Sequence, residues 1–159
     1  MIFVTIGTQP NGFLRFLKGV ENLINECNIQ EEIIAQTGNT DFHTTKYKTI
    51  PFLSENEFKE YMNKASVVLT HAGSGSLFNA IQAGKKIIAV ARLHKYNEMM
   101  NDHQLEIVKK LTDGGYILDG TESLIEAWKI LDGFTPRPYD FESHVVEELD
   151  RYIESVLLK

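Results

Sequence analysis

The stretch that decides the fold is Val67-Val68-Leu69-Thr70-His71-Ala72-Gly73-Ser74-Gly75-Ser76-Leu77, where an apolar run leads through small residues into an amphipathic segment. Val67–Leu69 is predicted as a buried strand and Leu77–Ala83 as a helix. Glycine and serine between them let an anion approach the backbone, where the unpaired N–H groups of a helix start face it. The stretch therefore predicts a phosphate-binding turn between a strand and a helix.

Short apolar runs alternate with amphipathic segments along the rest of the chain, which is typical of an α/β fold with a mostly parallel sheet. The other expected strands are Ile2–Ile6, Glu32–Gln36, Tyr47–Phe52, Lys86–Val90 and Tyr116–Leu118. The other expected helices are Phe13–Glu26, a segment capped by Ser54 and ending at Lys64, Asp102–Leu111, Ser123–Leu131 and Glu142–Leu158. We expect one doubly wound domain over residues 1–159, closed by a C-terminal helix at about 140–158, with its ligand at the carboxyl ends of the strands.

Composition narrows the function. The net charge is −6 and no run of Lys or Arg is long enough to grip a nucleic-acid backbone, so we do not expect non-specific binding to DNA or RNA. A single cysteine, Cys27, rules out an internal disulfide or a cysteine-based zinc site. The N-terminus has no signal-peptide pattern, and no window approaches the ~20 apolar residues of a membrane span. We expect a cytoplasmic protein that reaches a membrane only through a partner or a surface.

Two glycine-containing loops follow strands that are neighbours in a doubly wound sheet. Gly7-Thr8-Gln9 follows the first strand, and the Gly73 loop follows the fourth. These two strands flank the point where such a sheet changes winding direction, so both loops face one cleft. The alternative is that the glycines only make tight turns. No Gly-Lys-Ser/Thr motif and no G-x-G-x-x-G after the first strand are present, so a diphosphate held by backbone and hydroxyl groups fits better than a P-loop or dinucleotide site.

Four polar side chains are candidates for the site, and two of them, His71 and Arg92, have two interpretations each. His71 either packs against backbone or lines the phosphate or transferred group. Arg92 is either a surface arginine or a partner for a diphosphate or a uracil carbonyl. A histidine and an amide at a helix start, His103 and Gln104, are placed to reach sugar hydroxyls. None of the histidines has the spacing with a carboxylate that a metal site shows, so no metal is expected.

Three motifs, in this order and spacing, resemble the PssE-like bacterial exopolysaccharide glycosyltransferases: Phe3-Val4-Thr5-Ile6-Gly7-Thr8-Gln9, Thr70-His71-Ala72-Gly73-Ser74-Gly75-Ser76 and Asn101-Asp102-His103-Gln104-Leu105-Glu106. They also resemble the catalytic subunit of the eukaryotic UDP-N-acetylglucosamine transferase that acts on dolichol-linked glycans. Both groups are similar to the C-terminal, donor-binding half of MurG-type GT-B enzymes. The resemblance spans about Met1–Leu118.

The resemblance implies a Rossmann-like domain of the GT-B C-terminal type and a UDP-sugar-dependent, inverting, metal-independent hexosyltransferase without a further cofactor. It places the UDP diphosphate on Gly73, Ser74, Gly75 and Ser76, with Gly7 and Thr8 across the cleft. It places the donor sugar near His103 and Gln104, and the uridine ribose at Asn79, where a carboxylate is common. Asn97-Glu98-Met99 departs from the PssE-like Gly-Glu-His pattern and leaves Glu98 as the matching acid. The candidate catalytic residues are therefore His71 and Glu98, and Arg92 joins the donor-binding set.

The resemblance also implies a missing half. A separate PssD-like, membrane-associated subunit would bind the lipid-linked saccharide acceptor in polysaccharide or capsule biosynthesis, and it would hold this chain at the cytoplasmic membrane. An apolar stripe on the last helix either packs on its own domain or docks that partner: Val145, Val146, Leu149, Tyr152, Ile153 and Val156. The competing functions are a non-catalytic nucleotide-binding or regulatory module and, disfavoured by the short chain, a sugar-nucleotide epimerase fragment.

Overall fold

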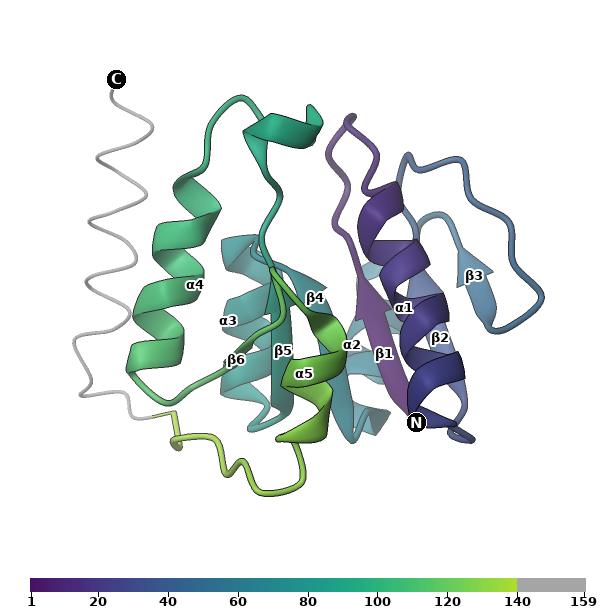
Figure 1. Ribbon diagram of the computed structural model, residues 1–159. Coiled ribbons are helices and arrows are strands. Elements are labelled where there is room, and N and C mark those ends of the chain that lie inside the picture. The colour runs from purple at the N-terminus through teal and green to yellow at the C-terminus, as the bar shows by residue number, and fades with distance from the viewer. Residues whose placement is uncertain (140–159) are drawn as a thin grey trace.

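The computed structural model describes residues 1–139, and these build one sheet of six parallel strands (Figure 1). The strands are β1 (Ile2–Thr5), β2 (Ile33–Gln36), β3 (Lys48–Ile50), β4 (Val67–His71), β5 (Lys86–Val90) and β6 (Leu118–Asp119). Their order is β3-β2-β1-β4-β5-β6, and every neighbouring pair is parallel. The chain winds outward in both directions from β1 and β4, so the predicted doubly wound, Rossmann-like α/β fold is confirmed.

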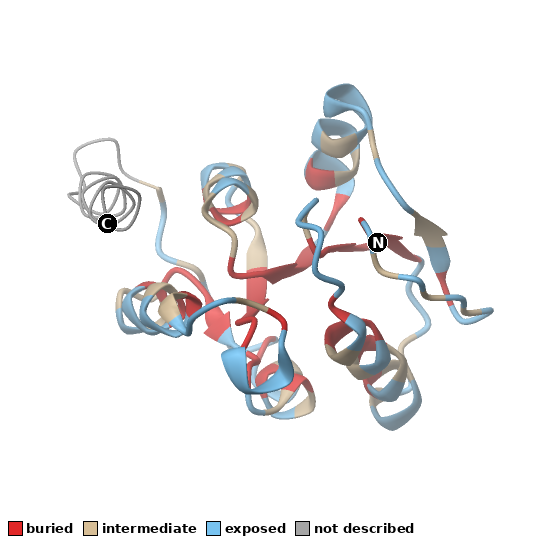
Figure 2. Ribbon diagram, turned by 90° about the horizontal axis from the view of Figure 1, so that it is seen from above, coloured by how far each residue is buried: buried red, intermediate tan, exposed pale blue. Residues whose placement is uncertain are grey.

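Helices cover both faces of this sheet, as the view from above shows (Figure 2). They are α1 (Leu14–Cys27), α2 (Glu55–Lys64), α3 (Ser74–Gln82), α4 (His103–Asp113) and α5 (Leu124–Lys129), with a short 3₁₀ turn, η1 (His94–Tyr96), before α4. One apolar cluster joins the sheet to α1 and α5, and a second joins it to α2, α3 and α4. The sheet is therefore buried on both sides, as a parallel sheet requires.

The central strand β1 shows how the two clusters share the sheet. Ile2 and Val4 point into the cluster with α1 and α5, whereas Phe3 points into the other cluster. This alternation follows from the two-residue period of a strand. All three side chains are fully buried, and each contributes roughly 1.5–3 kcal/mol through removal from water. The ends of β1 and β4 are thus fixed by packing on both faces, and the loops that follow them start from rigid positions.

The predicted elements are all present among residues 1–139, but their ends around the phosphate-binding turn differ from the expectation. β4 continues through His71, two residues past the predicted end, because Thr70 and His71 stay paired with β5. The helix α3 begins at Ser74, so the turn itself contains only Ala72 and Gly73. Ladder hydrogen bonds to a neighbouring strand outweighed the polar character of the local sequence.

Two expectations are not addressed by the described residues. The C-terminal helix at about 140–158 and its apolar stripe lie outside them, and a single domain over residues 1–159 stays a prediction. The 3₁₀ turn η1 was not expected from the sequence.

The capping box at the start of α2 is confirmed. Ser54 Oγ accepts from the Glu57 backbone N–H at 3.3 Å, and Glu57 Oε2 accepts from the Ser54 N–H at 2.8 Å. Two N–H groups that have no partner within the helix are thereby satisfied.

We expect Ser54→Ala to lower the free energy of unfolding by about 1 kcal/mol, because it removes this acceptor while the fold keeps its core. Urea denaturation followed by circular dichroism measures the change, and Ser54→Asp serves as the matched variant that keeps a capping acceptor. Equal stability of the Ala variant and the wild type would contradict the role of this cap.

Candidate functional site

Two turns stand side by side at the carboxyl edge of the sheet. Thr5 of β1 is paired with Thr70 of β4, so the residues that follow each strand emerge as neighbours. Gly7 has a φ of 72°, a left-handed conformation that favours glycine. Thr8 and Gly75 are exposed, and Gly73 is partly exposed. The structure therefore brings the two predicted loops together at the switch point of the sheet.

The imidazole of His71 fills the space between these two turns. A Cβ atom added to Gly7 would stand 2.6 Å from His71 Nε2, and one added to Gly73 would stand closer still. Both positions therefore need glycine for a steric reason, beyond the formation of a tight turn. His71 itself is only 7% exposed.

Burial and a hydrogen bond fix the protonation state of His71. Its Nδ1 lies 3.3 Å from the carbonyl oxygen of Thr5, which only accepts, so Nδ1 carries the proton and Nε2 does not. Burial first and the charge of Arg92 second lower the pKa of His71, the Thr5 carbonyl opposes both effects, and the resulting pKa is about 4. The ring is neutral at pH 7, with an unprotonated Nε2 facing the two glycine turns.

The first turn of α3 is the anion-binding feature of this edge. Gly73 is its N-cap and provides no side-chain acceptor, and the first helical hydrogen bond runs from Leu77 N–H to Gly73 O. The N–H groups of Ser74, Gly75 and Ser76 therefore precede the hydrogen-bond ladder of the helix. No acidic side chain lies in this turn, so the positive end of the helix dipole is not neutralised locally.

Asn79 lies one turn further along α3. It is exposed and lies four residues after Gly75, so both residues share one face of the helix. It lines a hollow of about 310 Å³ between α2 and α3, together with Phe58, Met62 and Ala83. The predicted ribose residue is therefore on the same helix face as the predicted phosphate turn.

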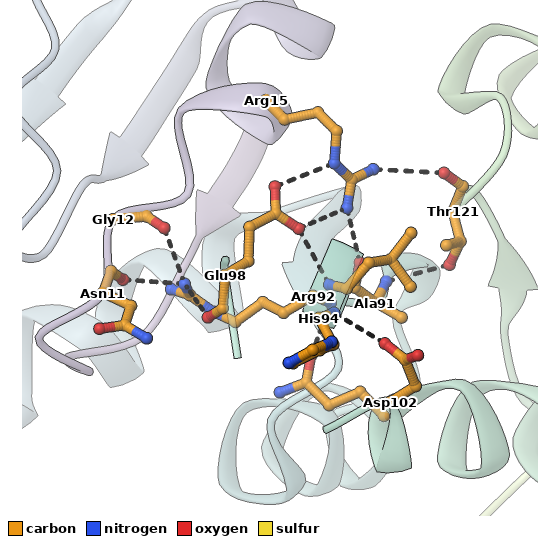
Figure 3. A network of polar contacts seen from close by, with 11 residues as sticks. Asn11, Gly12, Arg15, Ala91, Arg92, His94, Glu98, Asp102 and Thr121 are labelled. Carbon is orange, nitrogen blue, oxygen red and sulfur yellow. Dashed lines mark hydrogen bonds and ion pairs between the residues drawn. The ribbon is translucent and has the colours of Figure 1, made fainter. Parts of the chain in front are cut away.

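Arg92 does not reach the surface. It is 1% exposed, and its NH2 donates to the carbonyl of Ile6 at 2.9 Å. Its NH1 donates to the carbonyls of Asn11 at 2.8 Å and Gly12 at 3.0 Å (Figure 3). Burial lowers the pKa of its guanidinium, an effect that the nearby Glu98 opposes. The interpretation as a surface arginine is wrong, because the side chain is buried. A contact of Arg92 with a diphosphate or a uracil carbonyl stays a prediction.

Glu98 is also buried, and both of its carboxylate oxygens are occupied. Oε1 accepts from Arg15 Nε at 3.0 Å, and Oε2 accepts from Arg15 NH2 at 2.8 Å and from the Leu93 N–H at 3.0 Å. The sequence did not single out Arg15, because the arginine lies 83 residues away on α1. In this structure the carboxylate of Glu98 is held in an ion pair with Arg15. The catalytic role predicted for Glu98 stays a prediction.

The start of α4 carries His103 and Gln104. Gln104 is buried, and its Oε1 accepts from the Arg92 backbone N–H at 2.8 Å. His103 is partly exposed, and its N–H donates to Asn101 Oδ1 at 3.3 Å. Their predicted contact with a donor sugar stays a prediction, but the structure places both at the same sheet edge as the glycine turns (Figure 1).

A second hollow was not expected from the sequence. It measures about 410 Å³ and lies beside α1 and α5, with Arg15, Lys18, Tyr96 and Thr121 among its lining residues. Neither of these two hollows is lined by Gly7 or Gly73.

The described residues hold neither a metal-binding cluster nor a membrane-spanning helix. Within residues 1–139, no three His, Cys, Asp or Glu side chains gather closely enough to hold a metal ion. In the same part of the chain, no helix combines the length and apolarity needed to cross a bilayer.

A doubly wound parallel sheet with helices on both of its faces defines a Rossmann-like α/β domain, here of the GT-B C-terminal type. Comparison with known families agrees. The chain belongs to the glycosyltransferase family 28 C-terminal domain family, whose model matches residues 1–142.

The sequence identity to individual relatives is low. The chain is 28% identical over 123 residues to the human UDP-N-acetylglucosamine transferase subunit ALG13, a match that covers 73% of this chain and 10% of that protein. It therefore spans a small part of that relative. Among solved structures, it is similar to an NMR structure of ALG13, with a TM-score of 0.60, 19% identity and 92% of each chain covered. It is also similar to MurG from Acinetobacter baumannii, with a TM-score of 0.56, 16% identity, 82% of this chain and 39% of that chain covered.

The glycine turns generate a steric prediction. Gly73→Ala places a methyl group on the His71 ring, so we expect it to lower the free energy of unfolding by roughly 1–3 kcal/mol. Gly75→Ala is the matched control, because a Cβ there meets nothing within 4 Å and alanine suits a helix. Urea denaturation of both variants measures the difference. Equal stability of the two variants would show that His71 moves aside without cost.

The neutral His71 generates a pH prediction. Its pKa falls from 6.5 to about 4 on folding, so the unfolded chain binds more protons between these values. The contribution to stability is present above pH 6.5 and is lost as the pH falls toward 4, by on the order of 3 kcal/mol in total. We expect the free energy of unfolding of His71→Gln, measured by urea denaturation, to depend less on pH between pH 7 and pH 5 than that of the wild type. An NMR titration of the His71 ring with a midpoint near 6.5 would contradict this.

Proposed function

We propose that this chain is the donor-binding subunit of a two-component glycosyltransferase that moves a sugar from a UDP-sugar to a lipid-linked acceptor. The observation that carries the proposal is the uncapped N-terminus of α3, which opens beside the Gly7 turn at the switch point of the sheet. Backbone N–H groups in such a position bind phosphate without a metal ion. The family membership supports a glycosyltransferase, and the substrate class follows from the resemblance to UDP-sugar enzymes.

The proposed donor site runs along the carboxyl edge of the sheet. Ser74, Gly75 and Ser76 hold the diphosphate, with Gly7 and Thr8 on its other side. Asn79 binds the ribose as a neutral amide, and the start of α4, with His103 and Gln104, faces the donor sugar.

The proposed chemistry is charge stabilisation. When the bond to the sugar breaks, negative charge grows on the β-phosphate, and the fixed N–H groups of the first turn of α3 stabilise it. The unprotonated Nε2 of His71 lines this site from below without carrying charge at neutral pH. Because Glu98 is held by Arg15, we propose that the partner supplies the base that deprotonates the acceptor hydroxyl.

The proposed partner completes the site. A relative of this chain is named a subunit of UDP-N-acetylglucosamine transferase, which supports a two-subunit assembly. The acceptor-binding half would be a PssD-like, membrane-associated subunit, and this chain would act at the cytoplasmic face of the membrane through it. A role in exopolysaccharide or capsule biosynthesis follows from the PssE-like motifs.

Titration calorimetry with UDP tests the donor site. We expect UDP to bind the wild type, and Gly75→Val to lose at least 10-fold in affinity, or about 1.4 kcal/mol, because its side chain enters the space over the first turn. Gly133→Val is the matched control: this exposed glycine follows α5, near the start of β5 at the opposite edge of the sheet. EDTA is expected to leave the UDP affinity unchanged. Equal affinity of the Gly75→Val variant and the wild type would count against the site.

Co-expression with a PssD-like subunit separates the enzyme from a regulatory module. Transfer from a panel of UDP-sugars only in the complex supports the enzyme. UDP binding without transfer in any complex supports the non-catalytic alternative.

A further inference from the structure

One segment, residues 91–98 between β5 and α4, is hydrogen-bonded both to the β1–α1 loop and to the start of α4. We propose that Arg92 and the Arg15–Glu98 ion pair are positioning groups of this site, which hold the β1–α1 loop in its phosphate-binding conformation without touching the ligand. The inference rests on the proposed function and adds to it the groups that fix the loop geometry.

Arg92 ties down the β1–α1 loop at both of its ends. Its guanidinium donates to the carbonyl of Ile6, immediately before Gly7. It also donates to the carbonyls of Asn11 and Gly12, just before the N-cap of α1 (Figure 3). The loop between these contacts carries Gly7 and Thr8. Its conformation therefore depends on a buried cation that comes from a different part of the chain.

Arginine suits this place better than lysine. A planar guanidinium donates in several fixed directions at once, and here it reaches three carbonyl groups of the β1–α1 loop. Its face also packs against the ring of Phe13, with 4.6 Å from Cζ to the ring centroid. A lysine ammonium would keep the charge but would not hold the same three acceptors in this arrangement.

The Arg15–Glu98 pair provides a second connection between the same two segments. Arg15 extends from α1, donates to Glu98 through two nitrogens and also donates to the Ala91 carbonyl at 2.8 Å. Glu98 in turn accepts from the Leu93 N–H. The carboxylate thus joins the start of α1 to the chain that leaves β5, which is a structural use of its charge.

The other side of the segment holds the start of α4. The Arg92 N–H donates to Gln104 Oε1 at 2.8 Å, and the His94 N–H donates to Asp102 Oδ1 at 2.7 Å (Figure 3). The same few residues therefore set the separation between the proposed diphosphate turn and the proposed sugar-facing helix start.

The charge of Arg92 also reaches His71. It contributes to lowering the pKa of that imidazole, which lies between the glycine turns. A buried positive charge behind a phosphate site adds to the field of the helix N-terminus, and the low dielectric of the interior strengthens its effect.

Calorimetry with UDP, UMP and uridine tests the proposal on the full chain. For Arg92→Met we expect UDP affinity to fall at least 10-fold while uridine affinity stays within 2-fold, because only the phosphate contacts depend on the loop. The UDP affinity of Arg92→Lys is expected to lie closer to that of Arg92→Met than to that of the wild type on a logarithmic scale. Glu98→Gln and Arg15→Met are expected to show the same selective loss to a smaller degree.

A merely structural role predicts a different pattern, in which all three ligands weaken by the same factor as the folded fraction falls. That pattern, or UDP affinities equal to wild type in folded Arg92→Met and Arg15→Met variants, would overturn the proposal. If Arg92→Met does not fold, the Arg15 and Glu98 variants decide by the same criterion. Lys109→Met is the matched control, because it breaks an exposed Lys109–Asp113 pair on α4 and is expected to change no affinity.

Backbone NMR separates failure of this inference from failure of the proposed function. We expect the amide signals of Gly7 and Thr8 to shift in ligand-free Arg92→Met and Arg15→Met but not in Lys109→Met. If the wild type does not bind UDP, the proposed function is wrong, and these amide signals alone then decide whether the network positions the loop. Unchanged signals would overturn the inference.

Discussion

The parallel pairing of β1 with β4 is the constraint on which the rest of the structure depends. Both strands are buried on both faces, so their backbone positions are set by packing. Their direction places both following turns at one edge of the sheet. One strand leads to α1 and the other to α3, on opposite faces, and the His71 ring packs between the two turns. The N-terminus of α3 begins at this edge of the sheet, and this arrangement makes the edge suitable for an anion.

Positive potential at this edge has a local origin in an acidic chain. The net charge is −6, yet no acidic residue lies in the first turn of α3, and the cation of Arg92 lies beneath the glycine turns. The nearby buried carboxylate, Glu98, is neutralised by Arg15. His71 stays uncharged because it is buried. The proposed donor site therefore depends on backbone dipoles and one buried guanidinium.

Several residues of the proposed donor site are exposed to solvent at the carboxyl edge of the sheet. Thr8, Gly75 and Asn79 are exposed to solvent. A nucleotide held on such a surface keeps one side in water. Sugar transfer needs water to be excluded from the reacting bond. An exposed donor site therefore needs a second domain to cover it, and the proposed partner subunit would supply that cover.

The sequence by itself determined the fold class, the order of the strands and helices in residues 1–139, the capping box at Ser54 and the adjacency of the two glycine turns. These features follow from local hydrophobic periodicity, capping chemistry and the rules of parallel sheets. Only the tertiary structure decided that Thr70 and His71 extend β4, that Arg92 is buried, and that Glu98 is paired with Arg15. The physical reason is distance along the chain. Ladder pairing, burial and an ion pair between residues 83 positions apart depend on segments that no local pattern brings together.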